Sequence, residues 1–290
     1  MTVILRSGTR KALAALAERR SVLYDAVGRE SGGGTPGSDD VAAGGLSTVA
    51  DELYSVAGLL NAQSRLRRTL ADPSTSAESR AELVTSLLNN KVDPTTLEVA
   101  KTAAELRWSS PWDLPDALEA SADEALFAAA EKQGVLTTVE DELFRFERIL
   151  SGAGELTTLL DEKAVDPARR VALLESVVTG KVNPITVSLL RHAVRSDRKR
   201  SVVLAIDDLL EAAAGRQEHS LARVTTAVEL SAEQQQRLAA VLTALYGRPI
   251  NVRTAVDPTV RGGLVVRVGD ELIDGSITSR LLSARTALAG

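Results

Sequence analysis

Three acidic residues near the C-terminus are the side chains in this sequence that come closest to a metal-binding or catalytic group. Asp270, Glu271 and Asp274 lie close together, and carboxylate oxygens are ligands that Mg²⁺ accepts. Gly269-Asp270 also has the composition of a tight two-residue turn, and Ser276 offers an N-cap for a helix soon after Asp274. Turn and cap positions account for all three carboxylates, so we expect no metal site.

The histidines do not form a catalytic or metal-binding group either. The sequence has two, His192 and His219, in unrelated segments, and it has no cysteine. Neither a Ser–His–Asp triad nor a zinc site can be assembled from them, and disulfides and thiolate metal sites are excluded. His192 lies beside Arg191 and Arg195 in a helical pattern, so we expect it on the surface. We expect no catalytic residue, cofactor or metal.

Glycine-rich stretches can cradle phosphate groups, but the two stretches here lack the required neighbours. Gly32-Gly33-Gly34 has neither a preceding strand pattern nor a following Lys-Ser or Lys-Thr. Gly262-Gly263 is not followed by a capped helix, which weighs against a nucleotide-dependent enzyme that binds phosphate there. Such an enzyme stays an alternative, and calorimetry with ATP tests it.

Two further motifs have a structural explanation. Trp108 and Trp112 flank Pro111 in a link between helices, where we expect packing rather than a platform for a ligand. The basic run 195–200 is either a solvated junction between helices or a contact with an acidic partner, and we favour the junction. The sequence therefore contains no catalytic constellation.

The composition excludes several classes of protein. The 290 residues carry a net charge of −5 and a pI of about 5.3, which argues against a nucleic-acid partner. No apolar run reaches the ~20 residues of a membrane-spanning helix, and Val3-Ile4-Leu5 is too short for a signal peptide. We expect a soluble protein in a reducing compartment, without direct membrane insertion. Because only 3% of the residues are aromatic, its cores must consist of Ala, Leu and Val.

Most of the chain has the spacing of amphipathic helices. Residues 6–27 have the pattern of a first helix, with Leu16 and Leu23 on its apolar face. Residues 28–45 are rich in Gly, Ser and Asp around Pro36, so we expect a flexible loop there.

From residue 46 onward the helical pattern contains an internal repeat with an offset of 90 residues. The segment TVADEL at 48–53 returns as TVEDEL at 138–143. Further pairs in the same register are Leu70 and Leu160, Arg80 and Arg170, Leu83 and Leu173, Ser86 and Ser176, and Lys91-Val92-Asp93-Pro94 and Lys181-Val182-Asn183-Pro184. A register held without gaps over this distance indicates a duplicated helical unit.

The helix starts carry their own signals. Some place a side-chain acceptor at the N-cap and proline at the first helical position; these are Asp93-Pro94, Asp166-Pro167 and Asn183-Pro184. Thr75 with Glu78, and Thr137 with Glu140, have the spacing of capping boxes. Between these starts lie amphipathic segments of about 10–18 residues with short links. Each copy of the repeat is therefore predicted to be a small antiparallel helical bundle.

Towards the C-terminus the pattern changes to a mixture of strands and helix. Residues 221–228 and 250–256 have the composition of strands. The segment 231–245 between them is an expected helix, opened by a capping box of Ser231 and Gln234.

The last stretch alternates with period two and is punctuated by glycine. Residues 264–268 are an expected strand with one buried face, and Glu271-Leu272-Ile273 is the return strand after the Gly269-Asp270 turn. A closing helix is expected from Ser276 onward.

The run from Asp257 to Leu281 resembles the C-terminal signature of the delta subunit of F-type ATP synthase, whose mitochondrial counterpart is the oligomycin-sensitivity-conferring protein. The matching positions are Asp257, Pro258, Gly262, Gly263, Gly269, Asp270, Ile273, Asp274, Gly275, Ser276 and Leu281. The segment ALFAAAEKQG at 125–134 also looks like the opening helix of that family. We therefore expect one helix within 116–133 to end one bundle and to begin the next.

This resemblance implies a non-catalytic stator subunit in the peripheral stalk of the proton-translocating F-type ATP synthase. In the family, the helical bundle holds N-terminal segments of the alpha subunits and the C-terminal unit grips the C-terminal end of the b subunit, by helix-in-groove recognition. The subunit would link the alpha/beta catalytic head to b, at the cytoplasmic face of the cell membrane, so that the head resists rotor torque. Which copy of the bundle would meet the alpha segments stays open. A generic helical-repeat scaffold or adaptor is the alternative.

The predicted fold class is mainly α, with two tandem antiparallel helical bundles followed by a small α+β C-terminal domain. The expected domains are residues 1–118 for the first bundle with the loop at 28–45, residues 119–215 for the second bundle, and residues 216–290 for the α+β part. The duplicated bundle looks like the form of the delta subunit found in actinobacteria.

Overall fold

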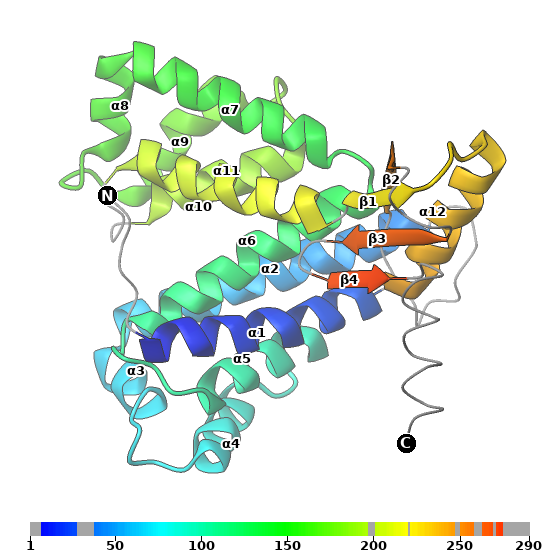
Figure 1. The fold of residues 1–290 in the computed structure, drawn as a ribbon. Helices are drawn as coiled ribbons and strands as arrows, with labels where there is room; N and C mark the ends of the chain where they lie inside the picture. Colours follow the sequence, from blue (N-terminus) through cyan, green and yellow to red (C-terminus); the bar gives the residue numbers. More distant parts are fainter. Residues whose placement is uncertain are drawn as a thin grey trace. The chain divides into compact units, whose positions relative to one another are not determined.

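The computed structural model of the chain describes residues 7–27, 38–196, 201–219, 221–246, 250–257, 263–268 and 271–274. Helices dominate these residues, and a small mixed sheet forms near the C-terminus (Figure 1). The prediction of a mainly α fold with a small α+β part is confirmed. The chain divides into two compact units, Met1–Leu210 and Glu211–Gly290.

The described part of the first unit contains helices and no strand. Its helices are α1 (Ser7–Ala26), α2 (Ser38–Ala62), α3 (Ser64–Leu70), α4 (Ala77–Leu88), α5 (Pro94–Glu105), α6 (Asp113–Lys132), α7 (Leu136–Gly152), α8 (Gly154–Asp161), α9 (Pro167–Val178), α10 (Pro184–Arg195) and α11 (Val202–His219), which continues into the second unit. The repeat maps α2–α5, the first copy, onto α7–α10, the second copy. The helix expected over 6–27 is α1.

The flexible loop predicted at 28–45 is wrong for its second part, because α2 already begins at Ser38. Ala42 and Leu46 are buried and continue the apolar face of α2 backwards along the chain. This burial outweighs the low helix propensity of the Gly44-Gly45 pair, which costs about 1 kcal/mol per glycine. Packing against the bundle therefore extends the helix into a segment whose composition favours a loop.

Helix α6 is the element around which the first unit is built. Every residue from Ala125 to Glu131 is buried, and a helix buried all around has neighbours on every face. It packs against α1, against α2 and α5 of the first copy, and against α7 and α10 of the second copy. Such packing suits a helix that two bundles share. The boundary predicted between residues 118 and 119 falls inside α6 and stays a prediction.

The repeat builds the same carboxylate joint in both copies. Glu52 of α2 accepts hydrogen bonds from the N–H of Asp93 (2.8 Å) and from the hydroxyl of the threonine three residues later (2.6 Å). Glu142 of α7 accepts the matching bonds from the N–H of Asn183 (2.9 Å) and from the corresponding threonine (2.5 Å). Each carboxylate therefore ties one helix to the N-terminal end of another, where the helix dipole favours negative charge.

A buried arginine closes the far end of the same helix in both copies. Arg80 of α4 donates from Nε to the carbonyl oxygen of Ala104 (2.6 Å), near the end of α5. Arg170 of α9 donates from Nη1 to the carbonyl oxygen of Val194 (3.0 Å), near the end of α10. These guanidinium groups satisfy carbonyls that helix termination leaves without intrahelical donors. The arginine pair found by spacing thus has one structural role in two places.

The predicted helix caps are partly right. The acceptor–proline starts are confirmed, with side chains that accept the N–H two residues later; these are Asp93, Asp166 and Asn183. Both capping boxes predicted in the repeat are wrong. Ser76, not Thr75, caps α4 and accepts the N–H of Ser79. Helix α7 already begins at Leu136, because burial of that side chain draws Thr137 into the first turn.

The second unit contains a four-stranded sheet with one helix between its strands. Its elements after α11 are β1 (Leu221–Thr226), α12 (Ala232–Tyr246), β2 (Asn251–Val256), β3 (Leu264–Val268) and β4 (Glu271–Asp274), in the sheet order β2-β1-β3-β4. β1 pairs in parallel with β2 through the α12 crossover, whereas β1–β3 and β3–β4 are antiparallel. These strands and α12 occur where the sequence predicts them.

The core of this sheet is small and aliphatic. It is formed by Ala222, Val224, Leu242, Ile250, Val266 and Val268. Val266 and Val268 are the buried residues of the period-two pattern, while Arg267 is exposed. The capping box of α12 is confirmed, since the N–H of Ser231 donates to Gln234 Oε1 (2.9 Å) and the N–H of Gln234 to Ser231 Oγ (3.2 Å).

Candidate functional site

The described signature residues have backbone roles in the sheet. The N–H of Asp257 donates to the carbonyl oxygen of Thr226 (2.8 Å), which joins the ends of β2 and β1. Gly263 has a φ of +80°, a region that favours glycine, directly before β3. Asp274 is the last residue of β4 and pairs with Val265. The signature positions outside the described residues are Pro258, Gly262, Gly269, Asp270, Gly275, Ser276 and Leu281, and the predicted turn and closing helix lie there too.

A cleft of about 860 Å³ lies inside the first unit, where the first copy faces the second. Helices α2 and α6 line one side, and α9, α10 and the start of α11 line the other. The α2 side presents Tyr54, Ser55, Gly58 and Asn61. The opposing side includes Ala168, Val171, Ala172, Glu175, Arg191, His192 and Arg195. The groove between α9 and α10 thus faces α2 of the same chain across the cleft.

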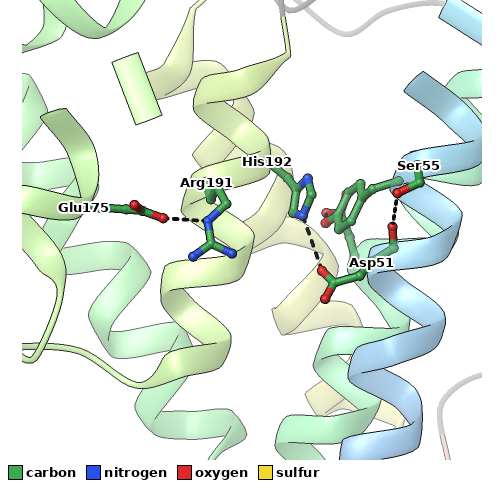
Figure 2. A network of polar contacts seen from close by, with 7 residues as sticks. Asp51, Ser55, Glu175, Arg191 and His192 are labelled. Carbon is green, nitrogen blue, oxygen red and sulfur yellow. Dashed lines mark hydrogen bonds and ion pairs between the residues drawn. The ribbon is translucent and has the colours of Figure 1, made fainter. Parts of the chain in front are cut away.

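One aromatic contact bridges this cleft. The rings of Tyr54 and His192 are stacked, with 11° between their planes and 3.3 Å between their centroids. The Tyr54 hydroxyl donates to Asp123 of α6. On the other side, His192 Nε2 lies 3.8 Å from Oδ1 of Asp51, as Figure 2 shows. The predicted surface position of His192 is therefore wrong, because α2 leaves only 14% of its side chain exposed.

Burial also sets the protonation states of Tyr54 and His192. Desolvation, followed by the positive charges of Arg191 and Arg195, lowers the pKa of His192 to about 3. The carboxylate of Asp51 acts in the opposite sense, but its side chain is 67% exposed and water screens it. Desolvation, followed by the Asp123 carboxylate, raises the pKa of Tyr54 well above its ordinary value. At pH 7 both rings are neutral, so they join the two copies by packing rather than by an ion pair.

An ion pair fixes the rim of the same groove. Arg191 Nε donates to Glu175 Oε1 at 2.7 Å, which connects α10 to α9 (Figure 2). Both side chains are 37% exposed, so the pair contributes no more than about 1 kcal/mol. Of the basic run 195–200, the structure describes only the first two residues.

The two tryptophans have different environments. Trp108 is buried and donates from Nε1 to the carbonyl oxygen of Ala103 (2.8 Å), so its predicted packing role is confirmed. Trp112 is 41% exposed, and the guanidinium carbon of Arg67 lies 3.3 Å from the centre of its ring. This cation–π contact anchors the loop before α6 to α3.

Within the ranges that the structure covers, no group of three or more His, Cys, Asp or Glu side chains is arranged to hold a metal ion. No helix among those ranges has the length and apolar character needed to span a bilayer. Tyr54 is not among the residues predicted from the sequence to form a site. The repeat offered a signal for Tyr54, because the offset of 90 pairs it with Phe144, so that both copies have an aromatic residue at this position. Phe144 itself is 50% exposed.

These features define a class of helical-repeat protein with grooves between paired helices, together with a small α+β unit. Residues 123–288, beginning inside α6, match the family described as ATP synthase delta (OSCP) subunit. The chain belongs to this family, which confirms the resemblance carried by its C-terminal run.

Relatives named ATP synthase subunit delta extend the match over most of the chain. The one from Streptomyces griseus subsp. griseus is 39% identical over 286 residues, which are 99% of this chain and 100% of the relative. The one from Salinispora arenicola is 43% identical over 244 residues, 84% and 89% of the two chains. The one from Corynebacterium diphtheriae is 44% identical over 238 residues, 82% and 87%. The residues before 123 lie outside the family match. They are nevertheless included in the match to the relative from Streptomyces griseus subsp. griseus, which extends over nearly all of both chains.

Proposed function

We propose that this protein is a non-catalytic stator subunit in the peripheral stalk of a proton-translocating F-type ATP synthase. It links the alpha/beta catalytic head to the b subunit, so that the head resists the torque of the rotor. Its helical bundles hold N-terminal segments of the alpha subunits, and its C-terminal unit holds the C-terminal end of b. It works peripherally at the cytoplasmic face of the cell membrane, as part of the complex.

The family match over residues 123–288 is the observation that carries this proposal. The matched range begins in α6 and includes the second copy and the α+β unit. The second bundle and the α+β unit are the two parts to which the family resemblance assigns partners, and both lie within the matched range. We keep the division into 1–118, 119–215 and 216–290 as part of the proposal, with α6 shared by the two bundles.

The packing of the first unit supports a mechanical role. A joint under torque needs helices that do not slide, and the carboxylates of Glu52 and Glu142 each fix one helix to the start of another. A helix from a partner can bury apolar anchors in a groove between two such fixed helices. Two binding sites on one chain, one in the helical bundles and one in the α+β unit, then supply avidity without any one strong contact.

Co-purification tests this function. The full chain with an affinity tag is isolated from membranes in mild detergent, and we expect the alpha and b subunits of the ATP synthase to be recovered with it. A variant that ends after residue 215 should keep the alpha subunit and lose b, because the α+β unit has its own core. Recovery of neither subunit with the full chain, or a measurable turnover of ATP by the purified chain alone, would contradict the proposal.

A further inference from the structure

A second groove lies between α4 and α5 of the first copy. It has a volume of about 680 Å³ and is lined by Glu78, Ala81, Glu82, Thr85, Ser86, Asn89, Lys101 and Glu105. Ala81 forms its buried floor, whereas Glu78, Glu82 and Ser86 are exposed along the α4 rim. The groove therefore has an apolar base between polar walls.

The repeat places an equivalent groove in the second copy. Six of its lining positions map, by the offset of 90, onto residues that line the groove between α9 and α10. These pairs are Glu78 and Ala168, Ala81 and Val171, Glu82 and Ala172, Thr85 and Glu175, Lys101 and Arg191, and Glu105 and Arg195. In the second copy this groove faces a helix, α2, across the cleft, and Tyr54 of α2 stacks on His192 of α10.

The charges of the two grooves differ. Glu78, Glu82 and Glu105 occupy positions where the second copy has two alanines and an arginine. Lys101 does not compensate for them, because its Nζ lies 2.7 Å from Oε1 of Glu98, outside the groove lining. Among the described residues no ion pair to these three carboxylates is found. Thr102 stands at the position equivalent to His192, so the first groove has no ring equivalent to the one that stacks on Tyr54 in the second.

We propose that the groove between α4 and α5 binds an α-helix of a partner protein that presents basic side chains at a spacing of three or four residues. Glu78 and Glu82 lie one turn apart on α4 and form charge pairs with two such side chains. Small residues of the partner helix, comparable to Ser55 and Gly58 of α2, allow its backbone to approach Ala81. The inference concerns a surface in the first copy and does not depend on the identity of the partner under the proposed function.

A second copy of this chain fits the groove less well. Its α2 already faces its own second copy across the cleft, and the equivalent face on α7 offers Arg145 and Arg148. Arg145, however, is paired with Asp141 one turn earlier on the same helix. Self-association is therefore the competing outcome in the experiment.

The experiment places a photo-cross-linking residue, p-benzoyl-phenylalanine, at Ser86 of the full chain in its native membranes. Ser86 is exposed and lines the groove, so a bound helix lies within reach. We expect an adduct with one other protein, whose cross-linked peptide is helical and carries at least two Arg or Lys residues three or four positions apart. Mass spectrometry of the adduct identifies that peptide.

A charge reversal on the rim tests the role of the carboxylates. Glu78→Lys/Glu82→Lys in the cross-linking chain should lower the adduct yield about tenfold, because two attractive pairs become repulsive. The matched control is Glu18→Lys/Glu155→Lys, with the same change in charge at two exposed residues outside the groove. Its yield should stay unchanged, and circular dichroism verifies that both variants fold.

Several results would overturn the inference. These are no adduct, an adduct between two copies of this chain, a peptide without the basic spacing, or a yield that the groove variant does not reduce. Failure here is distinct from failure of the proposed function. If ATP synthase subunits co-purify and Ser86 gives no adduct, only the groove inference fails. If the adduct forms with a protein outside the ATP synthase, the groove inference stands and the function is questioned.

Discussion

The two copies of the helical repeat share their internal joints and differ in their grooves. Glu52 and Glu142 make the same pair of hydrogen bonds to the start of a helix, and Arg80 and Arg170 close the end of that helix. Between the paired helices, in contrast, Glu78 of the first copy corresponds to Ala168 of the second. The joints and the grooves thus follow different rules within one duplicated unit.

This difference separates the residues that stabilise the bundle from the residues that line its grooves. A half-buried carboxylate or a buried guanidinium that hydrogen-bonds to the ends of helices cannot change without loss of stability. Substitution of an exposed groove residue usually changes stability little. The second groove faces α2 and has a histidine that stacks on Tyr54 of α2, whereas the first has carboxylates. The two copies therefore share the residues of their internal joints and differ in the residues of their grooves.

The largest effect is expected from the buried arginines. Arg80→Ala and Arg170→Ala should each lower the free energy of unfolding by about 3 kcal/mol, because carbonyls at a helix end lose their donors. Urea denaturation followed by circular dichroism measures this. The control Arg145→Ala removes an exposed pair on α7 and should stay within about 0.5 kcal/mol. A clear loss in one copy only would break the equivalence of the two joints.

The next effect is a dependence on pH that belongs to the second groove alone. Burial lowers the pKa of His192 to about 3 in the folded chain, against 6.5 for a histidine exposed to water. Between these values the unfolded chain binds more protons, so acid favours unfolding, while above pH 6.5 the effect is absent. The stability of the wild type relative to His192→Gln should therefore fall from pH 7 to pH 4, by up to about 3 kcal/mol.

Urea denaturation at a series of pH values measures the His192 effect. The same substitution at His219, the only other histidine in the sequence, is the control for loss of a histidine in general. A stability difference between wild type and His192→Gln that stays constant from pH 7 to pH 4 would contradict the burial of this side chain.

A smaller loss is expected at the carboxylate joints. Glu52→Gln and Glu142→Gln keep the shape of the side chain but remove its charge, which weakens two hydrogen bonds and the interaction with the helix dipole. We expect about 1–2 kcal/mol for each, measured by thermal denaturation. Glu155→Gln, on the exposed start of α8, should cost only a few tenths of a kcal/mol. Unequal losses for Glu52 and Glu142 would show that the copies differ inside as well as outside.

The smallest effect comes from exchanging the equivalent aromatic residues. Tyr54→Phe keeps the ring that stacks on His192 and removes the hydrogen bond to Asp123, so a loss of about 1 kcal/mol is expected. Phe144→Tyr makes the reverse change on an exposed face and should have almost no effect. Thermal denaturation of the two variants sharpens the comparison. Equal effects would mean that the Tyr54 hydroxyl contributes nothing to the contact between the copies.

Much of this protein was determined by local sequence signals. Asp93-Pro94 and Asn183-Pro184 start helices because an acceptor side chain and a fixed φ act within one turn. The alternation at 264–268 gives β3 because one face of a short strand is buried. The repeat predicted the paired arginines, and the C-terminal run predicted the family. Each of these depends on residues that are near in sequence or repeated in register.

Tertiary packing alone decided the rest. The burial of His192 depends on Tyr54 and Asp51, which lie in the other copy of the repeat and far away in the chain. The start of α2 at Ser38 depends on side chains that the bundle buries, although the local composition favours a loop. The full burial of Ala125–Glu131 in α6 requires helices on both sides. Desolvation and packing act between residues that only the folded chain brings together, and no local pattern contains them.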